Sequence, residues 1–171
     1  MSPANEQINP KDRERYNVIP RVLIFLFNED SVLLIKGAPD KKLWPGKYNG
    51  LGGHIEKGED TLGAARRELK EESGLHCNSL ELSGTVLVDT GGNPGVAIFV
   101  FRGVYEGGKI RSSREGDLEW VKLTQINDFP LVEDLHTILA LIARREPGKP
   151  AFSGRYYYDA DDQMQIVLSE S

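Results

Sequence analysis

The sequence predicts one α/β domain, built either as an α/β/α sandwich or as an α+β domain with a mixed sheet. Its 171 residues are enough for one sizeable core and too few for two ordinary domains. Segments rich in β-branched and aromatic residues alternate with two well-separated helical patterns, and no internal repeat interrupts them. This alternation favours strands and helices packed in layers.

The chain is expected to begin with a loose polar arm followed by a β-hairpin. Residues 1–16 are polar and contain two prolines. The runs 18–27 and 31–36 favour strands, and the polar residues 28–30 between them offer a turn. Residues 37–60 are rich in glycine and contain two prolines, which indicates a loop that wraps around something.

Two helices are predicted. Residues 61–73 are rich in helix formers, with Asp60 as an expected N-cap and Gly74 as the stop signal. A second helix is expected over 131–145, where leucine and isoleucine recur at the spacing of a buried face; Pro147 and the glycine after it end that pattern.

The remaining segments predict strands. Residues 81–90 and 96–105 are strand-like segments, and a glycine- and proline-rich turn joins them. Residues 118–123 favour a further strand, and residues 152–159 and 163–168 favour a last strand pair that closes the sheet.

The expected organisation has three regions: a polar arm over 1–16, the main domain over 17–147, and a C-terminal strand pair over 148–171 that packs on the same domain.

Composition and charge exclude several classes of protein. Hydrophobic residues make up 39% of the chain and charged residues 27%, which is ordinary for a globular protein. A net charge of −5 argues against an extended nucleic-acid surface, because such a surface needs a basic stripe to displace counterions. No apolar run approaches the roughly 20 residues of a membrane helix, and no signal-peptide pattern is present. Cys77 is the only cysteine, which excludes an internal disulfide and fits a reducing compartment, so we expect a cytoplasmic protein.

The chemistry of the chain is concentrated on the first predicted helix. Glu68, Glu71 and Glu72 fall within an arc of roughly 100° of the helical wheel, next to the stripe that packs on the core. One interpretation is a solvated face on which neighbouring basic residues relieve the repulsion between the acids. The other is a site for Mg²⁺ or Mn²⁺, which prefer carboxylate oxygens and often bridge the phosphates of a substrate.

The spacing around these acids resembles the signature of the Nudix hydrolases at every defined position. The pattern is G-x5-E-x7-R-E-L-x-E-E-x-G-L, and it is formed by Gly53, Glu59, Arg67, Glu68, Leu69, Glu71, Glu72, Gly74 and Leu75. The resemblance extends more loosely over residues 17–147. It implies an α/β/α sandwich with a mixed β-sheet, on which this box forms a loop, a helix and a second loop.

The resemblance also implies an activity and a cofactor. Members of the family hydrolyse a diphosphate linked to another moiety, usually a nucleoside, with divalent cations held by glutamates of the box. Here those glutamates are Glu68, Glu71 and Glu72, and the expected cation is Mg²⁺ or Mn²⁺. A backbone carbonyl of Gly52 or Gly53 is expected to complete the metal shell, as in relatives.

Two further residues are assigned to catalysis. Arg67 faces about 100° away from Glu68 on the helix, so we expect it to pair with Glu59 or to orient the glutamates instead of binding phosphate. Glu115 resembles the position that contributes a ligand or general base in bacterial mutator pyrophosphatases of the MutT type. Glu119, just before a tryptophan, competes with it for this role.

Substrate contacts are also suggested by resemblance. Residues 47–53 resemble the corresponding part of enzymes that sanitise oxidised purine nucleoside triphosphates, where an asparagine meets the base; here it is Asn49, whose amide can both donate and accept. The stretch 128–134 resembles the segment that supplies a second base contact, at Glu133 or Asp134. The alternative interpretations are an asparagine in a turn and an acidic first turn of a helix.

The sequence departs from those relatives in the segment expected to face the base. Leu131 and Val132 stand where the relatives have an aromatic platform for the base. Stacking would then fall to Trp44, Tyr48 or Phe129, and the preference for an oxidised guanine stays open.

We therefore expect a metal-dependent enzyme that cleaves a phosphoanhydride bond in a nucleoside triphosphate or another nucleoside diphosphate derivative. Its partner is a nucleotide substrate, and the chain is a monomer or a homodimer. The alternatives are an ADP-ribose or dinucleoside polyphosphate pyrophosphatase, a non-catalytic nucleotide-sensing domain of the same fold, and an isomerase, which would need a cysteine in the cleft.

Overall fold

The structure is a computed structural model that describes residues 15–40 and 43–169. Along the chain its elements are β1 (Val18–Asn28), β2 (Ser31–Gly37), β3 (Tyr48–Asn49), α2 (Thr61–Ser73), β4 (Glu81–Val88), β5 (Gly95–Val104), β6 (Gly116–Lys122), the 3₁₀ helix η2 (Leu123–Asp128), α3 (Leu135–Ile142), β7 (Phe152–Tyr158) and β8 (Met164–Ser169). Among the described helices, none is long and apolar enough to cross a bilayer.

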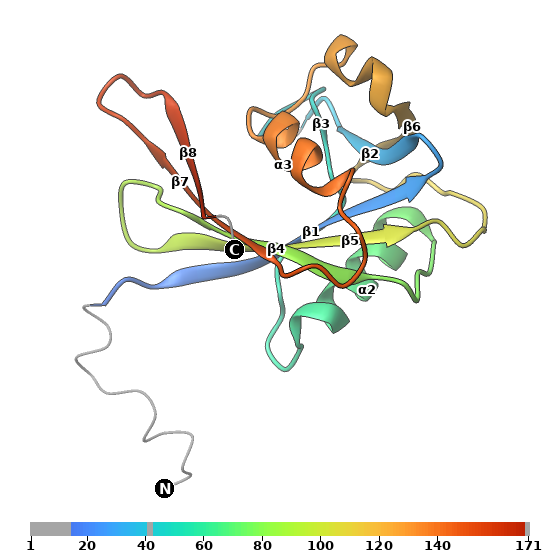
Figure 1. Ribbon diagram of the computed structural model, residues 1–171, viewed down its shortest axis with the longest axis horizontal. Helices are drawn as coiled ribbons and strands as arrows, with labels where there is room; N and C mark the ends of the chain where they lie inside the picture. The colour runs from blue at the N-terminus through green and yellow to red at the C-terminus, as the bar shows by residue number, and fades with distance from the viewer. Residues whose placement is uncertain (1–14, 41–42, 170–171) are drawn as a thin grey trace, which may run out of the picture.

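A mixed sheet forms the centre of the molecule (Figure 1). Its strands follow the order β3-β2-β1-β5-β4-β7-β8, and β6 pairs with β2. The pairs β1–β5 and β4–β7 are parallel, whereas β4–β5, β7–β8 and the pairs of β2 are antiparallel. The hairpin of β1 and β2 and the final strand pair are both present where the sequence predicts strands.

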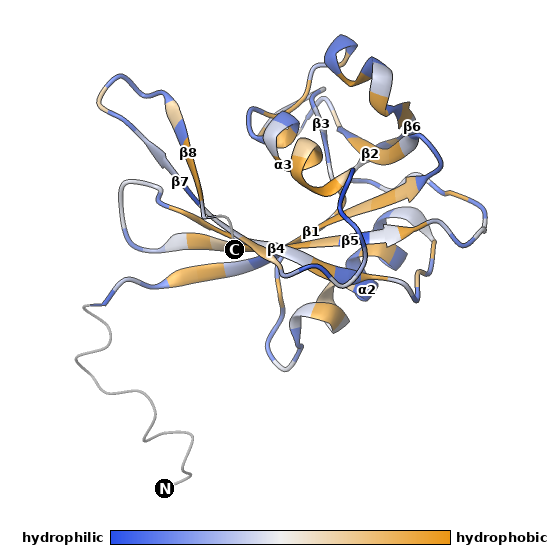
Figure 2. Cartoon of the chain, viewed as in Figure 1, coloured by the Kyte–Doolittle hydropathy of each residue, from blue (hydrophilic) through white to orange (hydrophobic). Residues whose placement is uncertain are grey.

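Two hydrophobic cores lie on opposite faces of this sheet, one under each helix. Because side chains alternate along a strand, β1 serves both cores. Val22, Ile24 and Leu26 pack with Ala65 and Leu69 of α2. Phe25 and Phe27 pack with residues of the other core, which includes the apolar face of α3. Figure 2 shows apolar residues concentrated along the central strands and in α3. The expected α/β/α sandwich is confirmed.

The helix α2 begins and ends at the predicted residues. Asp60 accepts a hydrogen bond from the Gly63 N–H at 2.7 Å, and so caps one of the unpaired amides of the first turn. Gly74 adopts a left-handed φ of 74°, and its N–H donates to the Lys70 carbonyl. These caps fix the position of the helix in the sequence, and with it the direction of the glutamates.

The helix α3 is shorter than predicted. It covers Leu135–Ile142 instead of 131–145, because the residues before it pair with β3. The Tyr48 N–H donates to the Pro130 carbonyl at 2.9 Å, and the Val132 N–H donates to the Tyr48 carbonyl at 3.1 Å. This backbone pairing replaces the expected first helical turn and holds the segment beside the glycine-rich loop. The short helix η2 before it was not predicted.

The strands β7 and β8 extend the main sheet. Gly84 of β4 faces Phe152 of β7, and a Cβ at residue 84 would overlap the Phe152 ring. Tyr156 of β7 is 1% exposed and joins the core under α3. The boundaries at residues 16 and 147 remain predictions, and residues 1–14 of the predicted arm lie outside the described residues.

The N-cap of α2 can be tested by Asp60→Ala. Loss of the side-chain acceptor should lower the free energy of unfolding by about 1 kcal/mol, because the Gly63 N–H loses its partner. The measurement is urea unfolding at neutral pH. Asp60→Ser keeps an acceptor and should remain within a few tenths of a kcal/mol of the unsubstituted protein; an equal loss for both variants would contradict the capping role.

Candidate active site

The glycine-rich loop is fastened to the first strand by backbone hydrogen bonds. The Val22 N–H donates to the Gly53 carbonyl at 2.9 Å, and the Ile24 N–H donates to the Leu51 carbonyl at 2.7 Å. Gly52 has a φ of +145°, and a Cβ there would overlap the Val22 carbonyl oxygen. A Cβ at Gly53 would overlap the Glu68 carboxylate. The two glycines therefore let the loop lie against both β1 and the side chains of α2.

Glu72 makes the most buried contact between the helix and this loop. Glu72 is 6% exposed, and its carboxylate accepts a hydrogen bond from the Gly52 N–H at 2.8 Å. A buried carboxylate needs such donors, because burial without them is costly. Glu68 is partly buried, and the side chain of Glu71 is 60% exposed. The three acids thus differ in depth while belonging to one face of α2.

Arg67 holds the helix and the loop together from the other side. Its guanidinium pairs with Glu59 at 2.6 Å, with Glu68 at 2.8 Å and with Glu71 at 3.2 Å, and also donates to the His54 carbonyl at 3.0 Å. These hydrogen bonds raise the pKa of Arg67, and the Arg67 side chain lowers the pKa of Glu59 from 4.5 to about 2. The expected contact with Glu59 is present, and Arg67 also contacts two of the glutamates.

The box glutamates share one cavity with Glu115. This acidic cavity has a volume of about 540 Å³. Its lining consists of Arg21, Gly52, Gly53, His54, Glu56, Glu68, Glu71, Glu72, Ser113, Arg114 and Glu115. Glu119, the competitor of Glu115, instead accepts a hydrogen bond from the Tyr48 hydroxyl at 2.6 Å and does not line the cavity. The geometry therefore favours Glu115 over Glu119 as the acid from outside the box.

The chemistry of this cavity fits a hard divalent cation. Carboxylates and a backbone carbonyl are the ligands that Mg²⁺ and Mn²⁺ prefer, and the cavity has room for an ion with its waters. Glu68 faces Arg67 and Glu72 faces the Gly52 amide. In the described part of the chain, no three acidic, histidine or cysteine side chains stand close enough to form an assembled metal cluster. The donors therefore share a cavity without being gathered around one point.

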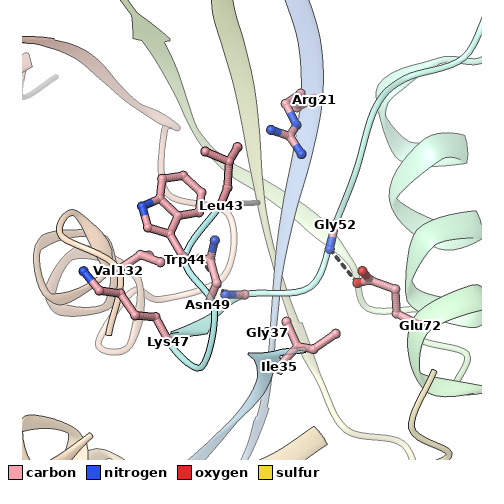
Figure 3. A pocket seen from close by; sticks show the side chains of 11 residues that line it. Arg21, Ile35, Gly37, Leu43, Trp44, Lys47, Asn49, Gly52, Glu72 and Val132 are labelled. Carbon is pink, nitrogen blue, oxygen red and sulfur yellow. Dashed lines mark hydrogen bonds between the residues drawn. The ribbon is translucent and has the colours of Figure 1, made fainter. Parts of the chain in front are cut away.

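A second cavity lies beside the first, around Asn49. It consists of two adjoining hollows of about 270 and 100 Å³, and we call both together the Asn49 cavity. The larger hollow is lined by Arg21, Ile35, Gly37, Leu43, Trp44, Lys47, Asn49, Gly50, Gly52, Glu72 and Val132 (Figure 3). The smaller hollow adds Val22, Leu23, Ile98 and Asp134. Polar and charged side chains therefore line this cavity together with apolar ones, a mixture that suits a ligand with both kinds of surface.

Of the two acids predicted as a second base contact, only one lines the Asn49 cavity. Asp134 lines the smaller hollow together with Asn49, whereas Glu133 is exposed and lines neither hollow. Burial raises the pKa of Asp134, and the nearby charge of Glu133 adds to this rise. Of the two candidates, Asp134 is the one in a position to meet a ligand beside Asn49.

The three aromatic candidates for stacking also differ in whether they line the Asn49 cavity. Tyr48 is buried with its hydroxyl on Glu119, and burial with this contact raises its pKa to about 12. Phe129 packs edge-on against the Tyr48 ring at 5.1 Å between centroids and lines neither hollow. Trp44 lines both hollows and is 42% exposed. Trp44 is therefore the aromatic side chain available to a bound base.

The acidic cavity and the Asn49 cavity meet at three residues, Arg21, Gly52 and Glu72, which line both. The sequence analysis did not single out Arg21. Its only signal was a lone charged residue inside the apolar run 18–27. The two cavities are therefore direct neighbours, with these residues between them.

The ion pair of Arg67 and Glu59 can be tested by the pH dependence of stability. A carboxylate whose pKa is about 2 when folded and 4.5 when unfolded stabilises the fold fully above pH 4.5, and loses this contribution as the pH falls to 2. Glu59→Gln should therefore be less stable than the unsubstituted protein at pH 7, with the gap closing between pH 4.5 and 2. The measurement is urea unfolding across that range.

The control is Glu146→Gln, which removes an exposed carboxylate paired with Lys149. It should change stability little at any pH. A gap for Glu59→Gln that stayed constant from pH 7 to pH 2 would contradict the linkage.

Comparison with known proteins shows which family the chain resembles. The NUDIX domain family matches residues 18–142. The human 8-oxo-dGDP phosphatase NUDT18 is 36% identical over 147 residues, which are 82% of this chain and 42% of that protein. The chain thus spans less than half the length of this relative. A mouse oxidized purine nucleoside triphosphate hydrolase is 31% identical over 150 residues, which are 86% of this chain and 92% of the relative.

A solved structure supports the same fold. The crystal structure of a MutT protein from Bacillus halodurans superposes with a TM-score of 0.74 at 24% identity, covering 88% of this chain and 97% of that one. With the complete box on α2 and its flanking loops and the family match over most of the chain, these findings establish that the protein belongs to the Nudix family.

Proposed function

We propose that this Nudix protein is a pyrophosphohydrolase that depends on Mg²⁺ or Mn²⁺. It cleaves a phosphoanhydride bond in a purine nucleoside triphosphate or diphosphate, with an oxidised purine as the leading base. The observation that carries the proposal is the junction of the two cavities. An acidic cavity suited to cations and phosphates adjoins, at Gly52 and Glu72, a cavity suited to a base.

At the phosphate end, the box glutamates have the donor chemistry for the cation. Glu68, Glu71 and Glu72 would hold it, and a bound cation neutralises charge on the phosphate oxygens and lowers the pKa of a water for attack. Arg67 fixes the Glu68 side chain by a hydrogen bond at 2.8 Å. Glu115, in a separate loop on the wall of the same cavity, is the candidate general base or further ligand.

At the base end, Asn49 and Asp134 offer complementary groups. The Asn49 Oδ1 accepts from the Gly50 N–H at 2.8 Å, which orients its amide. Asp134 lines the smaller hollow beside Asn49, and its carboxyl oxygens can accept hydrogen bonds from donors on the edge of a base. An oxidised purine carries altered donors and acceptors on its edge, so a pair of this kind can distinguish it. Trp44 supplies the aromatic surface that is lacking at Leu131 and Val132.

The named activities of the relatives support the class of substrate and leave the number of phosphates open. The human relative is named for a diphosphate of an oxidised guanine nucleoside, and the mouse relative for oxidised purine triphosphates. Both names agree with a purine in the Asn49 cavity and a phosphoanhydride in the acidic cavity.

A panel of nucleotides tests this proposal. The panel contains 8-oxo-dGTP, 8-oxo-dGDP, dGTP, dGDP, dCTP, ADP-ribose and a dinucleoside tetraphosphate, each with Mg²⁺, with Mn²⁺ and with EDTA. We expect kcat/KM to be highest for one of the 8-oxo nucleotides, and turnover to disappear in EDTA. Separation of the products by chromatography identifies the bond that is cleaved. A preference for ADP-ribose, or no hydrolysis of any nucleotide, would contradict the proposal.

The role of the box is tested by Glu72→Gln. Loss of one anionic ligand at the phosphate end should lower kcat by a factor on the order of 10³ or more. Folding should be nearly unchanged, because the glutamine oxygen can still accept from the Gly52 N–H. Turnover is measured on the best substrate of the panel, and folding by thermal melting. Glu146→Gln, an exposed change of the same kind, should retain full activity; retention by Glu72→Gln as well would overturn the metal assignment.

A further inference from the structure

Arg21 lies at the place where the two cavities meet. Its backbone is held on both sides of β1, since it is in register with Ile98 of β5 and forms an isolated bridge with His54 of the loop. The residue lines the acidic cavity and both hollows of the Asn49 cavity. Figure 3 shows its side chain reaching from the strand toward the space between Asn49 and Gly52. Arg21 therefore presents a guanidinium at a fixed point of the junction.

The guanidinium of Arg21 is not used by the ion pairs of the fold. Within residues 15–40 and 43–169, ion pairs are made by Arg67 and by Lys149, and none includes Arg21. Arg67, by contrast, is fully engaged by Glu59 and two glutamates of the box. Arg21 as a residue is partly buried. A guanidinium that has lost part of its hydration is stabilised by an anion, which it can bind through two parallel hydrogen bonds.

We propose that Arg21 binds the phosphate nearest the nucleoside and thereby sets the position of the substrate across the junction. The inference rests on the proposed function, because it needs a base in the Asn49 cavity and a phosphoanhydride in the acidic cavity. A nucleotide placed in this way passes the junction at the phosphate bonded to its ribose. The other two residues there, Gly52 and Glu72, offer no cationic side chain.

The position of Arg21 gives it a role different from that of a metal ion bound by the glutamates. A metal neutralises phosphate charge at α2, whereas Arg21 approaches from β1 and also borders the base hollows. Arg21 should therefore contribute to binding of a nucleoside monophosphate even when no metal is present. It should contribute little to binding of the nucleoside alone, which has no phosphate.

The test measures binding by isothermal titration calorimetry in EDTA, with 8-oxo-deoxyguanosine and its 5′-monophosphate as probes. The proteins are the unsubstituted chain, Arg21→Gln, Arg21→Lys and Arg66→Gln. Arg66→Gln removes an equal charge from an exposed position of α2 that lines neither cavity. Thermal melting confirms that each variant is folded.

We expect Arg21→Gln to weaken binding of the monophosphate about tenfold, because a charge-assisted pair is lost, and to leave nucleoside binding within about twofold. Arg21→Lys should give an intermediate loss, since an ammonium keeps the charge but not the planar fork. Arg66→Gln should change neither affinity. With metal and the best triphosphate or diphosphate substrate, Arg21→Gln should raise KM by more than it lowers kcat.

Two results would overturn the inference while leaving the proposed function intact. One is an unchanged affinity of Arg21→Gln for the monophosphate; the other is an equal loss for nucleoside and monophosphate, which would place Arg21 at the base or in the fold. If the unsubstituted chain bound neither probe, the oxidised-purine assignment itself would be wrong, and the role of Arg21 would fall with it.

Discussion

The hydrogen bond from the Gly52 amide to the Glu72 carboxylate is the contact on which the rest of the site depends. It joins α2, on one face of the sheet, to the loop fastened along β1. Because Glu72 is almost fully buried, its carboxylate requires this donor, and the left-handed region at Gly52 is what allows the loop to supply it. The same two residues form the boundary between the acidic cavity and the Asn49 cavity.

The acids beside this contact repel each other, and the positive charge of Arg67 compensates for this repulsion. Glu68 lies three residues before Glu71 and four before Glu72, and like charges at these spacings repel each other. Arg67 relieves the repulsion at Glu68 and Glu71 and links both to Glu59 across the loop. This network fixes the loop and the helix as one unit beside the acidic cavity. Stability and the proposed function therefore draw on the same charges.

The fold and the acidic part of the site were largely predictable, because they follow from short-range patterns. The caps at Asp60 and Gly74 fixed α2, and helical spacing alone placed the three glutamates on one face. The start of α3 was predicted wrongly at residue 131, because backbone pairing of residues 130–132 with Tyr48 overrides the local pattern. Local propensity carries no information about such a distant partner.

The sequence by itself determined the family, the capped helix and the identity of the acids that line the cavity, since each depends on residues close together in the chain. Only the tertiary structure showed that Asp134 and not Glu133 lies beside Asn49, and that Glu115 and not Glu119 lines the acidic cavity. It also showed that Trp44, unlike the buried aromatic rings, lines the Asn49 cavity. It also brought Arg21 to the junction. These choices depend on which side chains meet across the sheet, and that is set by the register of distant strands and by burial, which no local pattern encodes.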